Sequence, residues 1–154
     1  MQLPNANVRA SSYLIAETQV HCAQCSRACR VLALGLPPGH EILVDDEWQN
    51  VDANAFIFHV TALPESVSRL LLERSAAFHQ TCSDDRSEVP WVNHCARCAS
   101  VFSDDELHCE PGGFMPNSID EAQAISVSQV EQPFSAFAAG YALDPEHFAS
   151  MRRR

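Results

Sequence analysis

Short apolar runs alternate with turn residues along most of the chain, a pattern typical of a β-rich protein. The runs combine branched and aromatic side chains and end at Pro, Gly, Asn or Asp residues, which favour turns. We therefore expect several short strands rather than long helices. The predicted strands cover residues 12–20, 30–36, 41–44, 55–60, 89–93 and 125–130.

Helical spacing of apolar residues interrupts this pattern in a few places. The main predicted helix covers residues 63–79, with Pro64 and Glu65 in its first turn. Shorter helices are expected after Ser118, which begins a capping-box motif, across residues 134–141, and after Asp144. The pattern as a whole predicts an α+β fold with one main helix and short C-terminal helices.

Four of the seven cysteines form two CxxC pairs, Cys22/Cys25 and Cys95/Cys98. Two cysteines at this spacing in a tight turn direct both sulfurs at one point, and two such knuckles give a tetrahedral four-sulfur site. Zinc suits such a site because it has no redox chemistry of its own. The spacing therefore predicts one structural Zn²⁺ per chain, although the gap between the pairs exceeds that of compact zinc ribbons.

Other uses of the cysteines remain open. A CxxC pair can be a redox-active dithiol, but that motif normally opens a helix, whereas the residues after Cys98 are poor helix formers. Cys29 and Cys109 could join one pair each and create two metal sites, and an iron–sulfur cluster is formally possible. We expect Cys29, Cys82 and Cys109 to be bystanders, because free cysteine usually behaves as a small buried apolar residue.

The two knuckles are related by an internal repeat with an offset of 73 residues, which aligns 7 identical residues over 21–39. Each half is interpreted as a knuckle, a strand and a Pro-Gly turn. The predicted organisation is a single zinc-stabilised domain over 1–151 followed by a frayed basic tail. Its parts are half-repeats at about 12–40 and 89–116, a helical insertion at 61–82, a C-terminal extension at 117–151, and the tail 152–154.

The net charge of the chain argues against some classes of function. The 154 residues include 20 acidic and 10 basic residues, all ten of them arginine, for a net charge of −10. Nucleic-acid binding through phosphates needs the opposite sign, so we expect none. The sequence also lacks a long apolar run or an export-type start, so we expect no membrane span. With an odd number of cysteines, this favours a reducing, cytoplasmic setting.

One loop carries groups that could catalyse hydrolysis. Residues 104–110 hold four carboxylates and His108, and either His94 or His108 could serve as a base. Such a site needs carboxyl groups with separated pKa values, and acidic loops are far more often solvated surface. We therefore predict no catalytic residues.

The segment 91–98, with the Glu110-Pro111-Gly112-Gly113 stretch, resembles a zinc-ribbon-like family of uncharacterised bacterial and phage proteins. Residues 13–34 resemble the opening knuckle of that family. The resemblance covers roughly residues 12–116. It implies a zinc-ribbon-like β core with a four-cysteine zinc site at the two CxxC pairs, and it brings no known activity.

These observations favour a zinc-stabilised, non-catalytic binding module. A site closed by four cysteines leaves no open position for catalysis, and the acidic surface suits a basic protein partner. A redox sensor, in which Cys29 and Cys109 oxidise and release zinc, is the second hypothesis. A hydrolase that uses the loop from Asp104 to Glu110 is the third.

Overall fold

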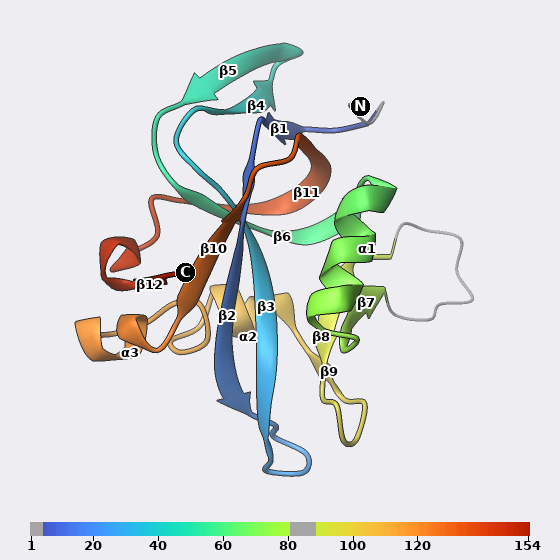
Figure 1. Cartoon of the computed structure of the whole chain (residues 1–154), viewed down its shortest axis with the longest axis vertical. Coiled ribbons are helices and arrows are strands. Elements are labelled where there is room, and N and C mark those ends of the chain that lie inside the picture. Colours follow the sequence, from blue (N-terminus) through green and yellow to red (C-terminus); the bar gives the residue numbers. More distant parts are fainter. Residues whose placement is uncertain (1–4, 81–88) are drawn as a thin grey trace.

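The computed structural model describes residues 5–80 and 89–154, and nearly half of these residues lie in β-strands (Figure 1). They form a nine-stranded sheet with the order β12-β10-β2-β3-β6-β11-β1-β4-β5 and a three-stranded sheet, β7-β8-β9. The strands are β1 (Val8–Ala10), β2 (Tyr13–His21), β3 (Ala28–Leu36), β4 (His40–Val44), β5 (Glu47–Val51), β6 (Ala55–Ala62), β7 (Phe78–Gln80), β8 (Trp91–His94), β9 (Val101–Phe102), β10 (Ser126–Val130), β11 (Phe134–Leu143) and β12 (Arg152–Arg153). The helices are α1 (Glu65–Arg74), α2 (Asp104–His108), α3 (Ile119–Gln123) and the 3₁₀ helix η1 (Phe148–Ser150).

The centre of the large sheet is covered on both faces. Successive residues of a strand point to opposite faces, and in β2 and β3 both sets are buried. Leu14 and Val31 belong to one apolar cluster, while Tyr13 and Leu34 belong to the other. This double burial explains why these two segments are nearly continuous apolar runs in the sequence.

The β2–β3 hairpin continues beyond this core and carries the first CxxC pair at its tip. β10 pairs with β2 only up to Glu17, and β6 pairs with β3 only from Leu34 to Leu36. The hairpin pairing itself continues to His21, opposite Ala28. The far half of the hairpin therefore extends as a two-stranded projection (Figure 1), and the β8–β9 hairpin lies beside it.

The β-rich α+β expectation agrees with the structure, but the predicted helix across residues 134–141 is wrong. The segment is β11, the longest strand, which pairs with β1 and β6. Its small residues allow either conformation locally, and strand pairing on both sides decides the outcome. Gly140 lies directly beside Phe58, where any Cβ would collide with the ring.

The main helix is shorter than the apolar spacing indicated. α1 ends at Arg74, and Phe78 begins β7, which pairs with β8. An aromatic residue at this place satisfies a helical pattern and a strand pattern equally well. The pairing of β7 with β8 therefore ends α1 at Arg74, about one turn after Leu71.

The basic tail is ordered and not frayed. Arg152 and Arg153 form β12, which lies parallel to β10 at one end of the large sheet. The backbone N–H of Arg152 donates to the carbonyl of Ile125, and the N–H of Arg154 donates to that of Val127. The helix predicted just before the tail is reduced to η1.

Candidate metal centre

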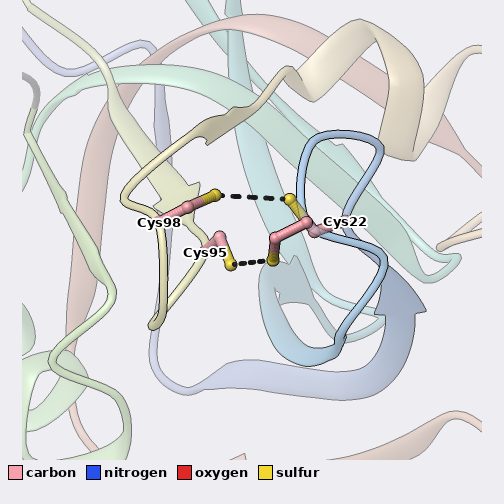
Figure 2. Close-up of side chains that lie close together, drawn as sticks. Cys22, Cys95 and Cys98 are labelled. Carbon is pink, nitrogen blue, oxygen red and sulfur yellow. Dashed lines mark hydrogen bonds between the residues drawn. The ribbon is translucent and has the colours of Figure 1, made fainter.

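The tips of the β2–β3 and β8–β9 hairpins face each other and bring four sulfur atoms together (Figure 2). The Sγ atoms of Cys22, Cys25, Cys95 and Cys98 all lie within 4.8 Å of one another. The Sγ distances are 3.6 Å from Cys22 to Cys98 and 3.6 Å from Cys25 to Cys95. A tetrahedron with metal–sulfur bonds of about 2.3 Å has edges of about 3.8 Å, so the cluster has the dimensions of a four-thiolate metal site.

The two cysteine turns have the same backbone geometry. In the first, the N–H of Cys22 donates to Arg27 O at 2.8 Å, and the N–H of Ser26 donates to Cys22 O at 2.8 Å. In the second, the N–H of Cys95 donates to Ser100 O at 2.8 Å, and the N–H of Ala99 donates to Cys95 O at 2.9 Å. The internal repeat of the sequence therefore corresponds to a repeated turn.

Ser26 and Ala99 occupy the position at which the turn needs a left-handed backbone. Their φ values are 64° and 65°, in a region that glycine adopts most easily. The turns therefore form without glycine, but the backbone of Ser26 and Ala99 is strained. Beyond the knuckles the repeat fades, since Leu34 lies on β3 while its counterpart Leu107 lies on α2.

Backbone N–H groups favour thiolates at the first cysteine of each pair. N–H groups of Cys98 and Arg97 lower the pKa of the Cys95 thiol to about 6. The N–H of Arg97 lies 3.4 Å from the Cys95 sulfur. Equivalent N–H groups in the first turn lower the pKa of Cys22. Metal binding requires thiolates, so this local electrostatics suits metal ligation.

The side chain of Asn93 fixes the position of the second hairpin. β6 pairs with β3 only from Leu34 to Leu36, so the backbone of Leu32 has no strand partner on the β6 side, and Asn93 lies there. Asn93 Oδ1 accepts from the N–H of Leu32 at 2.8 Å, and its Nδ2 donates to Leu32 O at 2.9 Å. Asn93 was not among the predicted site residues, although a polar residue directly after Val92 in the predicted strand 89–93 was a visible signal.

The two described cysteines outside the pairs, Cys29 and Cys109, differ in their surroundings. Cys29, expected to be a bystander, is buried in β3, and its thiol lies 3.3 Å from the Cys95 sulfur. It therefore contacts the four-sulfur cluster without being one of its four members. Cys109 is exposed at the end of α2. Cys82 falls outside the described residues, so its predicted role stays a prediction.

The histidines that precede each pair do not belong to the sulfur cluster. His21 is exposed. His94 is buried, and its ring stacks on that of His79 with centroids 3.9 Å apart. His94 Nδ1 lies 3.1 Å from Ala77 O, which helps attach β8 to the chain after α1. Neither histidine is a member of the four-residue cluster.

Within the described residues, no hydrogen bond or ion pair joins His108 to a carboxylate of the acidic loop, and the His59 ring instead lies 3.0 Å from the Asp105 carboxylate. Residues 104–108 form α2, and the buried carboxylate of Asp104 accepts from the backbone N–H of His59 at 2.8 Å. The ring of His108 stacks on that of Phe58, with centroids 4.6 Å apart. Glu106 and Glu110 are exposed.

Comparisons with known proteins give no relative from which to transfer a function. No protein-family model matches the chain, and no curated protein or solved structure matches it either. Among the described residues, no helix is long and apolar enough to cross a membrane. Assignment of a function therefore depends on the four-cysteine site and the surface around it.

Proposed function

We propose that the chain is a zinc-stabilised, non-catalytic binding module. The observation that supports this is the meeting of four Sγ atoms from two hairpin turns separated by about 70 residues. Four thiolates close the coordination sphere of Zn²⁺, as in structural sites, and leave no position for a reacting water. When bound, zinc would supply folding free energy on the order of 10 kcal/mol by joining the two hairpins. Membership of the zinc-ribbon-like family stays a prediction.

The partner proposed for the module is a basic protein. The chain carries a net charge of −10, which attracts positively charged surfaces and repels nucleic acids. The exposed carboxylates of Asp105, Glu106 and Glu110 extend this negative charge next to the second knuckle. Capture from the native host should therefore yield basic proteins that elute with salt and persist after nuclease treatment. Capture that depends on nucleic acid would contradict the proposal.

Metal analysis of the full chain tests the zinc site. The purified protein should hold one zinc, and cobalt substitution should give the visible spectrum of a tetrahedral four-thiolate complex. Cys22→Ser and Cys98→Ser should each lose that spectrum. Cys109→Ser is the matched control, because Cys109 is exposed and lies outside the sulfur cluster. A folded wild-type protein without metal would remove the basis of the proposal.

The position of Cys29 favours one second candidate, a thiol redox sensor. Its thiol is 3.3 Å from the Cys95 sulfur, within reach of disulfide formation after a small movement. Hydrogen peroxide would take two electrons from Cys95, giving a sulfenic acid and one water. The Cys29 thiol would then attack that sulfur, forming the disulfide and releasing a second water. Zinc would lose one of its four ligands.

The two candidates make different predictions for Cys29→Ser. For the sensor, peroxide should release zinc from the wild type at concentrations that leave Cys29→Ser loaded, and a thiol reductant should restore binding. For the module alone, the wild type and the variant should lose zinc at the same peroxide concentration. Cys109→Ser serves again as the control with an unrelated thiol removed.

A further inference from the structure

Arginine side chains gather at one end of the large sheet, although the chain as a whole is acidic. Five of the ten arginines lie there, contributed by β3, by the last residue of α1 and by the C-terminal residues 152–154. Three of them pair with Glu17 of β2, whose side chain is only 9% exposed. The five are Arg30, Arg74, Arg152, Arg153 and Arg154.

The carboxylate of Glu17 neutralises only part of this charge. Its nearest partner is Arg154 Nη1 at 3.1 Å, while Arg74 Nη1 and Arg30 Nη1 lie at 3.7 Å and 3.8 Å. One carboxylate is thus shared by three guanidinium groups. The side chain of Arg152 has no ion pair or hydrogen bond to any other part of the chain that the structure describes. The cluster therefore has a local excess of positive charge.

A groove of about 530 Å³ opens over this cluster. Its walls include Arg30 and the three C-terminal arginines, with Glu17 as the one acidic lining residue among the described ones. Thr18 and Ser126 add hydroxyl groups. Pockets that hold small ligands span about 300–1,000 Å³, so the volume suits a molecule and not only an ion.

The backbone that carries Arg152 and Arg154 is held in place before any ligand arrives. The backbone of β12 is hydrogen-bonded along β10 through Arg152 and Arg154. Residues two apart on a strand point to the same side, so these two guanidinium groups share one face. Preorganisation of this kind lowers the entropy cost of binding.

We propose that this groove binds a small dianion, a phosphorylated or dicarboxylate metabolite whose compact oxyanion contacts Arg152 and Arg154. Guanidinium groups bind such oxyanions through paired, charge-assisted hydrogen bonds. The positive patch is a local feature of a chain with net charge −10. That combination favours a small anion, because a nucleic acid or a long acidic peptide would extend beyond the patch and meet a chain whose net charge is −10. The site contains none of the four clustered cysteines and is independent of the proposed zinc function.

Nuclear magnetic resonance titration of the zinc-loaded full chain tests this proposal. The probes are inorganic phosphate, a sugar phosphate and succinate, with a neutral sugar as the negative control. Saturable shifts of the arginine Nε–H signals should appear at the groove. A lower dissociation constant for the sugar phosphate identifies a phosphorylated ligand, and a lower one for succinate identifies a dicarboxylate.

Variants separate this site from a general charge effect. Arg152→Gln with Arg154→Gln should weaken binding by about tenfold or more, because two charge-assisted contacts are lost. Arg69→Gln is the matched control, since Arg69 is an exposed arginine of α1 that pairs with Glu65 outside the groove. Glu17→Gln should tighten binding several-fold, because it removes the competing carboxylate.

Three results would overturn the assignment. The first is the absence of saturable shifts with all three anions at millimolar concentration. The second is equal binding by the wild type and the Arg152/Arg154 double variant, both of which should retain zinc and the folded spectrum. The third is tighter binding of an acidic peptide or a single-stranded oligonucleotide than of any small anion, which would assign the groove to a macromolecule.

Discussion

The side-chain amide of Asn93 pairs with the backbone of Leu32 as a neighbouring strand would, donating one hydrogen bond and accepting another. Leu32 is the position at which β3 has lost β6 as a partner. A single side chain therefore joins the hairpin of the second cysteine pair to the strand that leaves the first pair. This contact is one of the links between the two hairpins that carry the cysteine pairs.

We expect Asn93→Ala to lower both the free energy of unfolding and the affinity for zinc. Two backbone groups at a buried site would lose their partners, at a cost of about 2–4 kcal/mol in total. The second hairpin would also be less firmly placed against the first. Chemical denaturation and a competitive zinc-chelator titration measure the two effects.

Asn7 provides a matched control for this prediction. It makes the same pair of contacts with Ala138, donating to its carbonyl at 2.8 Å and accepting from its N–H at 2.9 Å. Asn7→Ala should therefore reduce stability without changing zinc affinity relative to the wild type. Equal zinc affinities for both variants would show that Asn93 does not position the metal centre.

Glycine at position 99 should stabilise the second knuckle. Ala99 has φ = 65°, which costs a non-glycine residue about 1 kcal/mol or more. Ala99→Gly should raise the free energy of unfolding of the zinc-loaded protein by up to about 1 kcal/mol. Ala96→Gly in the same turn is the control, because Ala96 has no positive φ to relieve. Its added chain entropy should destabilise by about 0.5–1 kcal/mol, and a gain there would contradict this explanation.

Gly140→Ala should destabilise the fold around α2. A Cβ at this position would lie 2.2 Å from the Phe58 ring, which itself stacks on His108. The ring must move, at a cost of about 1–3 kcal/mol typical of overpacking. Gly35→Ala is a milder comparison, since its closest contact would be 3.1 Å. Thermal unfolding of the two variants should show the larger loss for Gly140→Ala.

The stability of the protein should fall in mild acid because of His108. Burial, with a smaller contribution from the charge of His59, lowers the pKa of His108 to about 4, below the value near 6.5 of an unfolded chain. Between these two values the unfolded state binds more protons than the folded state. Stability is therefore fully present above about pH 6.5 and decreases by up to about 3 kcal/mol as the pH falls to about 4.

A comparison of His108→Phe with the wild type measures this effect. Phenylalanine keeps an aromatic ring beside Phe58 and Phe114 and removes the titrating nitrogens. The variant should lose less stability than the wild type between pH 6.5 and pH 4. His147→Asn is the control, since asparagine tolerates the left-handed backbone of that position. Acid also releases metal from both proteins, so measuring them side by side cancels that contribution. Identical slopes of the free energy of unfolding against pH for His108→Phe and the wild type would refute the prediction.

The sequence by itself determined the strand-rich character of the chain and its two CxxC pairs. Both are local signals. The apolar runs of β2 and β3 follow from burial on both faces, and the CxxC spacing specifies a turn that directs two sulfurs to one side. Ser26 and Ala99, the residues after the two pairs, adopt the left-handed backbone that glycine takes most easily.

Only the tertiary structure decided the features that depend on distant pairing. Residues 134–141 have helical spacing, yet pairing with β1 and β6 makes them part of β11. In the sequence Cys29 lies outside both CxxC pairs. In the structure the two hairpins face each other, and the Cys29 sulfur lies 3.3 Å from the Cys95 sulfur. The arginines that pair with Glu17 come from segments more than 100 residues apart, and no local sequence pattern predicts that they meet. Contacts between distant segments depend on how the chain closes on itself, which periodicity and spacing do not encode.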